Sequence, residues 1–235
     1  MLAHALAILA CVGSSLAVNV AAKELLLAAR AAPIYLSSST TRATIKRLAA
    51  AVEASEAAPE TIGASARWRL LATTRTQGSE LLQLMDANPA LGEFQIFQIT
   101  HPGEENGRLR VNNGITIARA ADADWRSAWT LLAPGGQSSL VLEHDATVEC
   151  SGSCPRVSLT LRRAVLDGTR RGSDKVEEIL GVPLPNLPAG LEELVRAEAA
   201  TYDVTFEDEM LRVTRGVTRG ERPVLRVFER IIGGE

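Results

Sequence analysis

Charged side chains that could do chemistry gather near the C-terminus, where four acids precede two arginines: Asp203, Glu207, Asp208, Glu209, Arg212 and Arg215. Carboxylates placed close together can act as a general acid and base or bind a cation. The alternative is a solvated turn between two strands, because Asp side chains hydrogen-bond to the backbone of turns. We favour the turn, in which the arginines point outward or pair with these acids. A further alternative is an arginine–acid pair buried at the mouth of the barrel, where charges must be matched.

Histidine and cysteine offer little material for a catalytic or metal site. His144-Asp145 with His101 could ligate a metal or form a base with its orienting acid, but the chain has only 3 His. Cys150 and Cys154 flank a Ser-Gly-Ser turn that is tight enough for a disulfide, and a disulfide-closed loop and two free thiols are equal alternatives. The sequence contains no Gly-x-Ser-x-Gly motif, phosphate-binding loop or dinucleotide fingerprint. It therefore predicts no catalytic residues, no metal and no cofactor.

Alternation of apolar and polar side chains predicts many short strands after residue 64. The expected strands cover residues 67–73, 94–99, 108–111, 115–117, 140–148, 157–162, 202–215 and 223–232, with a further hairpin beginning at 125–132. Their near-regular spacing and breaker-rich turns are typical of an antiparallel meander that closes into a barrel or a sandwich. At the start of the 202–215 stretch, the residues expected on one face are Tyr202, Val204 and Phe206, and those on the other are Asp203, Thr205 and Glu207.

Two helices are expected before the strands. Residues 23–32 are rich in Leu and Ala, and Pro33 ends this helix. The polar run 37–41 can cap a second helix. In that helix, apolar residues recur at helical spacing at Ile45, Leu48, Ala49 and Val52. A further helical segment with a proline-rich connector is expected within residues 173–200.

A barrel of about eight strands has an interior that can hold side chains or one small ligand. The predicted ligand-lining residues are Trp68, Leu70, Phe97, Tyr202, Phe206, Leu211 and Val213. We expect Trp68, on the first strand, to close one end. The first helix carries Leu25, Leu26 and Leu27, and it is expected either to plug a barrel end or to lie at a lipid surface.

The N-terminal 22 residues are predicted to be a targeting leader. Residues 1–12 are nearly all apolar, and Ser15-Leu16-Ala17 is a small-x-small cleavage site. A signal anchor extending to Ala22 is the alternative. Residues 23–47 have a transit-peptide-like composition, although we favour folded helix for most of this segment. The expected organisation is a leader over 1–22 and one domain over 23–235, with helices over 23–55 and the barrel over 64–232.

The charge distribution argues against nucleic-acid binding. The net charge is -3, and the 22 Arg and 3 Lys are spread along the chain rather than gathered in a basic stripe. Hydrophobic residues make up 46% of the chain and aromatic residues only 4%. The chain can therefore bury one sizeable core made mainly of aliphatic side chains.

Several motifs resemble the plastid lipid-associated proteins, also called fibrillins. The closing signature of that family, aromatic-x-acidic-acidic-x-Leu-Arg-Ile/Val-Ser/Thr-Arg-Gly, matches Phe206, Asp208, Glu209, Leu211, Arg212, Val213, Thr214, Arg215 and Gly216. The opening strand of the family resembles Gly63 followed by Trp68-Arg69-Leu70-Leu71, with Ala72 in place of the usual Tyr. A middle segment resembles Phe97-Gln98-Ile99 and then Asn112 or Asn113. The motifs occur in the order of the family.

This resemblance implies a mainly β fold with N-terminal helices, namely a lipocalin-like antiparallel β-barrel. It implies a structural, lipid-binding plastid protein without a catalytic reaction. Such a protein would bind an apolar isoprenoid or acyl ligand, by burial of apolar surface, at plastoglobules or thylakoid membranes. The leader would direct the chain into the plastid. The alternatives are a lipocalin-like enzyme acting on a lipid or isoprenoid, and a secreted lipocalin-like carrier.

Overall fold

The computed structural model of this chain describes residues 20–55, 59, 62, 65–74, 91–102, 109–119, 137–150, 154–167, 171–173, 200–217 and 223–232. Three expected features lie outside these residues. They are the leader up to residue 19, the hairpin at 125–132 and the helical segment within 174–199.

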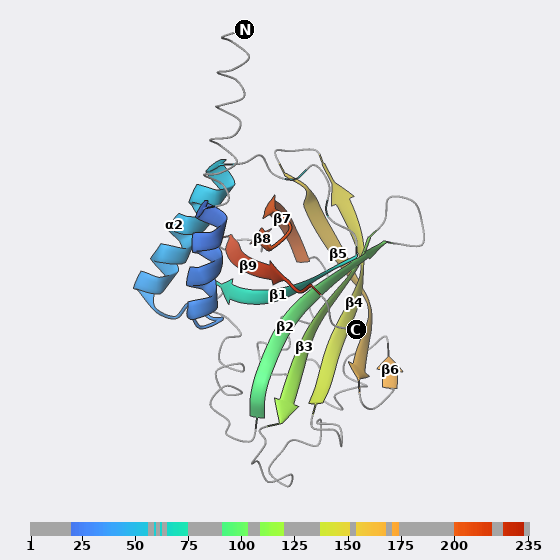
Figure 1. Ribbon diagram of the computed structural model, residues 1–235. Coiled ribbons are helices and arrows are strands. Elements are labelled where there is room, and N and C mark those ends of the chain that lie inside the picture. Colours follow the sequence, from blue (N-terminus) through green and yellow to red (C-terminus); the bar gives the residue numbers. More distant parts are fainter. Residues whose placement is uncertain are drawn as a thin grey trace, which may run out of the picture.

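The described strands form one antiparallel sheet that closes on itself (Figure 1). They are β1 (Ala66–Thr73), β2 (Leu91–Pro102), β3 (Leu109–Arg119), β4 (Gln137–Glu149), β5 (Arg156–Asp167), β6 (Arg171–Ser173), β7 (Ala200–Glu207), β8 (Leu211–Val217) and β9 (Val224–Arg230). Strands β1 to β5 pair in sequence, β5 pairs with β7, and β7, β8 and β9 continue the ring back to β1. The short β6 pairs with β5 outside this ring. Eight strands therefore form an up-and-down barrel, which confirms the predicted lipocalin-type fold.

Two helices precede the barrel, over residues 20–31 and at α2 (Ser39–Ser55). Ser38 caps α2, because its Oγ accepts a hydrogen bond from the Thr41 amide at 3.4 Å. The buried residues of α2 are Ile45, Leu48, Ala49 and Val52, which confirms the predicted apolar stripe. Between the helices, Tyr35 forms a bridge with Thr73 at the end of β1. No helix in the described part of the chain is long and apolar enough to cross a membrane.

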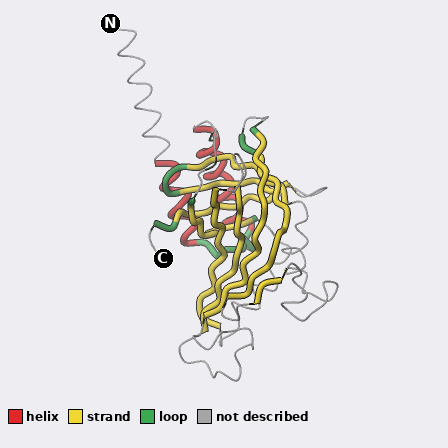
Figure 2. The backbone as a smooth tube through the Cα atoms, turned by 90° about the vertical axis from the view of Figure 1, so that its right-hand side faces the viewer, coloured by secondary structure: helices red, strands yellow, loops and turns green. Residues whose placement is uncertain are grey.

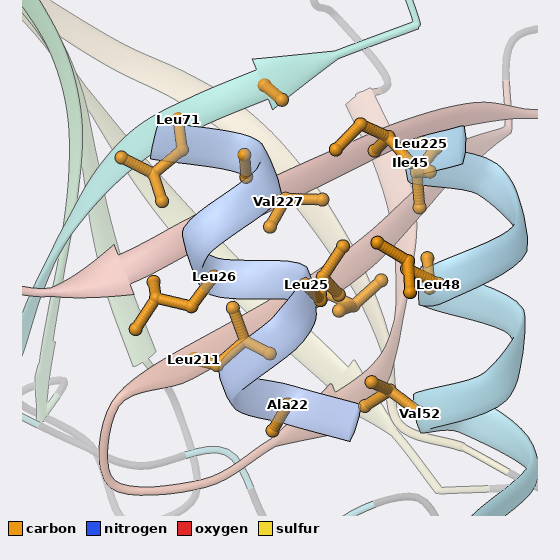
Figure 3. Packing of buried hydrophobic residues seen from close by; sticks show 14 of the residues in the cluster. Ala22, Leu25, Leu26, Ile45, Leu48, Val52, Leu71, Leu211, Leu225 and Val227 are labelled. Atoms are coloured by element: carbon orange, nitrogen blue, oxygen red, sulfur yellow. The ribbon is translucent and has the colours of Figure 1, made fainter. Parts of the chain in front are cut away.

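Both helices cover the outer wall of the barrel beside β1, β8 and β9, and the long strands β2–β5 extend well beyond them (Figures 1 and 2). Their contact with the wall is an apolar cluster formed by residues that include Leu25, Leu26, Ile45, Leu48, Val52, Leu71, Leu211, Val213, Leu225 and Val227 (Figure 3). Burial of apolar surface on the helices and on the barrel wall holds the helices against the outside of the barrel. The first helix therefore does not plug a barrel end. Of its three consecutive leucines, Leu27 is the exposed one, at 65%.

A β-bulge in β7 reverses the direction in which its last side chains point. Val204 pairs with Thr214, whereas Phe206 pairs with Val213. Adjacent strand residues point to opposite faces, so Phe206 lies on the face opposite to Val204. The prediction that Phe206 shares a face with Tyr202 and Val204 is wrong, because the extra residue, Thr205, interrupts the alternation.

Strand β3 runs without a break through Asn112-Asn113-Gly114, which joins the two short stretches expected on either side. Gly114 pairs with Phe97 on β2, and the Phe97 ring lies over the glycine. A Cβ atom at residue 114 would lie 2.3 Å from Cζ of that ring. Glycine is thus required here by the close approach of an aromatic ring, rather than by a turn.

Candidate functional site

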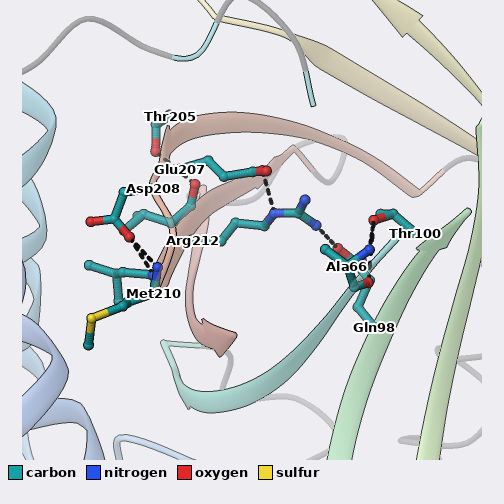
Figure 4. A network of polar contacts seen from close by, with 10 residues as sticks. Ala66, Gln98, Thr100, Thr205, Glu207, Asp208, Met210 and Arg212 are labelled. Atoms are coloured by element: carbon teal, nitrogen blue, oxygen red, sulfur yellow. Dashed lines mark hydrogen bonds and ion pairs between the residues drawn. The ribbon is translucent and has the colours of Figure 1, made fainter. Parts of the chain in front are cut away.

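The side chains that point into the barrel follow from the strand register. The residues of β8 and β9 that contact the helices outside are Leu211, Val213, Leu225 and Val227. Residues between them point inward, because side chains alternate along a strand. Arg212 shows this directly, since it reaches from β8 to Gln98 on β2, past the two intervening strands (Figure 4). The residue register of the paired strands then shows which residues of the other strands point inward.

Two groups of buried apolar side chains line this inward face. We call the first the β3–β7 cluster, which consists of Val111, Ala146, Val157, Leu159, Tyr202 and Val204. The second, the β1–β9 cluster, consists of Ala66, Trp68, Leu70 and Phe228. Apolar walls with a few polar groups are typical of sites for apolar ligands.

A chain of polar side chains, the Arg212 network, connects the two clusters (Figure 4). Arg212 donates from Nε to Glu207 Oε2 at 2.7 Å and from Nη1 to Gln98 Oε1 at 2.9 Å. Gln98 in turn donates from Nε2 to Asn113 Oδ1 at 3.0 Å. The guanidinium carbon lies 4.4 Å from the ring centroid of Trp68. Glu207 compensates the charge of the buried guanidinium, and the indole face adds a cation–π contact.

Tyr202 joins this network to the β3–β7 cluster. Burial raises the pKa of its hydroxyl above the ordinary value of 10.0, against the opposing effects of Arg212, Arg226 and a hydrogen bond with Gln98. The phenol therefore stays protonated at neutral pH. It supplies a hydrogen-bonding group at an otherwise apolar wall.

The four acidic residues singled out in the sequence have separate roles. Asp208 shapes the turn between β7 and β8, because its Oδ1 accepts hydrogen bonds from the amides of Met210 and Leu211, both at 2.7 Å. This confirms the turn interpretation for Asp208 and its exposed neighbour Glu209. Asp203 pairs with Arg156 on the outside of the barrel at 2.7 Å. Within the described residues, no group of three or more His, Cys, Asp or Glu side chains could hold a metal ion.

The remaining residues of the closing motif lie on both faces of β8. Arg212 is buried and points inward, whereas Arg215 points outward to Glu53 of α2 at 2.6 Å. Gly216 lies on the inward face, where an added Cβ would be 2.5 Å from Nη1 of Arg226. The glycine leaves space for this guanidinium.

The histidines do not form the catalytic dyad that the sequence raised. His144 is buried on the inward face, and its Nδ1 donates to the carbonyl of Val111 at 3.2 Å. Asp145 is exposed on the outward face, so it does not orient His144. His101 is half-buried on the outward face, with its Nε2 3.4 Å from Nδ2 of Asn112. Beside the β4–β5 turn, Cys150 is exposed, Cys154 is half-buried, and no disulfide joins the two.

The structure divides the seven predicted lining residues between the two faces. Those that point inward are Trp68, Leu70 and Tyr202. Those that pack against the helices outside are Phe206, Leu211 and Val213. Phe97 lies on the outward face, with the guanidinium of Arg67 5.1 Å from its ring centroid.

Sequence reasoning missed the inward roles of Gln98 and Asn113. It left open a buried pair of arginine and acid, which the structure shows as Arg212 with Glu207, but it did not say which acid points inward. The inward position of Gln98 could have been predicted, because Gln98 alternates with its neighbours in the same way as Ile96 and Thr100 and shares their face of the strand. A polar residue at such a position needs a partner inside. Glu207 carries no comparable signal, since the bulge in β7 determines its direction.

Comparison with known proteins places this barrel in a family. The PAP_fibrillin family model matches residues 24–226. No curated protein shows a significant match. Among solved structures, Japanin from Rhipicephalus appendiculatus bound to cholesterol aligns at 11% identity over 71% of this chain and 75% of that chain. The TM-score of this alignment is 0.29. The family match spans well over half of the chain, and the chain therefore belongs to the PAP_fibrillin family.

Proposed function

We propose that this protein binds an apolar isoprenoid or acyl ligand inside its barrel and associates with the lipid bodies or thylakoid membranes of a plastid. The observation that carries the proposal is the inward face of the closed ring, which is lined by the β3–β7 and β1–β9 clusters. Family membership supports a lipid-associated, ligand-binding protein and a plastid location.

The driving force would be transfer of a hydrocarbon chain from water to these apolar walls, at about 25 cal/mol per Å² of buried apolar surface. The ring closes by hydrogen bonds between β9 and β1, so the backbone polar groups of the wall are paired. The Arg212 network adds the few polar groups that orient a ligand in such a site.

Extraction of bound lipid tests the proposal. The full chain is purified without detergent, extracted with organic solvent, and the extract is analysed by mass spectrometry for apolar molecules in stoichiometric amount. Ala146→Leu enlarges a buried inward side chain of β4, and Thr147→Leu adds bulk at the exposed outward neighbour as the matched control. We expect Ala146→Leu to reduce the bound lipid and Thr147→Leu to leave it unchanged, with folding of both checked by circular dichroism.

Two results would overturn the proposal. One is a folded protein that carries no apolar molecule and takes none up from detergent-dispersed lipids. The other is equal lipid content in Ala146→Leu and Thr147→Leu. Location is tested separately, by following the full chain with a C-terminal tag through plastid fractionation. Recovery in the secreted fraction would favour the carrier alternative instead.

A lipocalin-like enzyme remains the alternative from another class. It would need titratable groups that face the barrel interior. Of the candidates named for it, His144 points inward, while Asp145 and Cys150 are exposed. The inward groups His144, Tyr202 and Glu207 keep this alternative as the second candidate, and the apolar clusters that surround them favour the lipid-binding function.

A further inference from the structure

Two buried hydrogen-bond donors on the inward face have no acceptor in the part of the chain that the structure describes. They are Nη2 of Arg212 and Nε1 of Trp68. The two residues are 0% and 1% exposed. Buried donors in folded proteins are almost always paired, so two orphaned donors side by side call for an explanation.

The guanidinium of Arg212 is held in one orientation. Its Nε is bonded to Glu207, its Nη1 is bonded to Gln98, and its Cζ lies over the indole of Trp68. These contacts leave Nη2 pointing in a fixed direction. Because the guanidinium carbon lies 4.4 Å from the ring centroid, both unsatisfied donors border the same region of the interior.

The charge of this region favours an anion. Two guanidiniums border the indole of Trp68, since the guanidinium carbons of Arg212 and Arg230 lie 4.4 and 6.0 Å from its ring centroid. One carboxylate, that of Glu207, is bonded to Arg212. An ionised carboxylate would bring the missing negative charge, together with oxygens that accept from both donors.

The surroundings of the donors favour an amphiphile rather than a small anion. Trp68 belongs to the β1–β9 cluster, and the Arg212 network reaches the β3–β7 cluster through the hydrogen bond between Gln98 and Tyr202. A hydrocarbon chain attached to the carboxylate could lie along these apolar walls.

We infer that the barrel binds a lipid that has a free carboxylate, of the fatty-acid type. One carboxylate oxygen accepts from Arg212 Nη2, and the other accepts from Trp68 Nε1. The acyl chain contacts the two apolar clusters. This inference rests on the proposed function, because it names the class of ligand that the barrel takes.

The direct test compares two probes that share one chain. The full protein, freed of lipid on a hydrophobic resin, is titrated with cis-parinaric acid and with its methyl ester, and binding is followed by probe fluorescence. Esterification removes the charge and leaves the hydrocarbon unchanged. We expect the acid to bind about 10- to 100-fold more tightly than the ester, as one charged hydrogen-bonding group implies.

Variants of Trp68 and Arg212 then test whether the two donors cause the preference for the acid over the ester. Trp68→Phe keeps an aromatic face for the guanidinium and removes only the indole N–H, so the acid should bind more weakly while the ester is unaffected. The pair Arg212→Gln with Glu207→Gln removes both charges together and should abolish the preference. Arg156→Gln with Asp203→Asn neutralises the exposed outward pair and is the matched control, for which we expect the wild-type preference.

The outcomes separate this inference from the proposed function. If acid and ester bind equally well to the wild-type protein, the inference of a carboxylate site is wrong, while the proposed binding of an apolar ligand in the barrel is supported. If neither probe binds, the proposed function itself fails. The wild-type comparison needs no variant to fold. If the acid preference is present but survives in Trp68→Phe and in the Arg212/Glu207 variant, the site is wrongly located.

Discussion

The carboxylate of Glu53 on α2 accepts two hydrogen bonds from the guanidinium of Arg215 on β8, at 2.8 Å from Nε and 2.6 Å from Nη2. It also accepts one from the hydroxyl of Thr205 on β7, at 2.6 Å. The pKa of Arg215 is raised, mainly by its hydrogen bond with Glu53. One acid of the helix thus bonds to two strands and sets the position of α2 along the outer wall.

Glu53→Gln should lower the free energy of unfolding by about 1–2 kcal/mol, because Arg215 loses its charged partner at a half-buried site. The measurement is urea unfolding followed by circular dichroism. Glu143→Gln is the matched control, since Glu143 receives the same two-point contact from Arg163 in a more exposed pair. We expect about 0.5 kcal/mol or less for the control. Equal losses would show that the Glu53 contact does not fix the helix.

Leu25→Ala should destabilise the protein by about 2–5 kcal/mol, because Leu25 is fully buried between the first helix and the barrel wall. Leu27→Ala removes the same atoms from the exposed face of that helix and should change the stability by about 0.5 kcal/mol at most. Thermal unfolding of the two variants gives the comparison. Similar melting temperatures would mean that the first helix does not pack on the wall as described.

Gly114→Ala should cost about 1–3 kcal/mol, since the new methyl group would meet the ring of Phe97. The loss should be smaller in a Phe97→Leu background, where the ring that occupies this space is gone. A double-mutant cycle in urea measures this coupling. Strictly additive effects would contradict the contact between Phe97 and Gly114.

His144 should make stability depend on pH below neutrality. Burial lowers the pKa of its imidazole in the folded state below the ordinary value of 6.5, against the opposing effect of its backbone hydrogen bonds. Between the folded and unfolded pKa values the unfolded chain binds more protons, so stability falls as the pH drops below about 6.5. The loss reaches its full size below the folded pKa.

The variant His144→Gln should flatten this part of the curve of unfolding free energy against pH, while keeping an N–H that can donate to the Val111 carbonyl. His101→Gln, on the outward face, is the control and should retain the wild-type slope. A slope that is the same in wild type and His144→Gln would show that other groups carry the pH dependence.

The fold was predictable because its signals are local and repeated. Alternating side chains marked β1, β4, β5 and β9, and the helical spacing of Ile45 and Val52 marked α2. The number and order of the strands left a barrel and a sandwich open, and the family resemblance favoured the barrel. The bulge at Thr205 was not predictable, because one extra residue depends on how two strands fit together rather than on any single side chain.

The candidate site was predictable only in part. Trp68 and Tyr202 were placed inside by their alternation with polar neighbours. Leu211 and Val213 alternate equally well, but the sequence does not say which face of β8 the helices cover. For Arg212 the sequence left an outward position and a pair with its acidic neighbours open, and the structure shows the pair with Glu207. Its other partners could not be predicted, because they lie far away in the sequence. Those partners, Gln98 and Trp68, come together with it only once the barrel has closed.

The pairing of β9 with β1 has a consequence for how the protein is made. The two strands lie at opposite ends of the barrel sequence, and residues such as Trp68 and Arg230 pair across them. A polypeptide that leaves a ribosome or a translocation pore N-terminus first can form its hairpins early, yet this seam must wait for the final strand. A chain truncated before Val224 would present two unpaired edges to chaperones and proteases. The β9–β1 pairing therefore forms only after β9 has been synthesised, and the barrel is closed to a lipid's surroundings only from that point on.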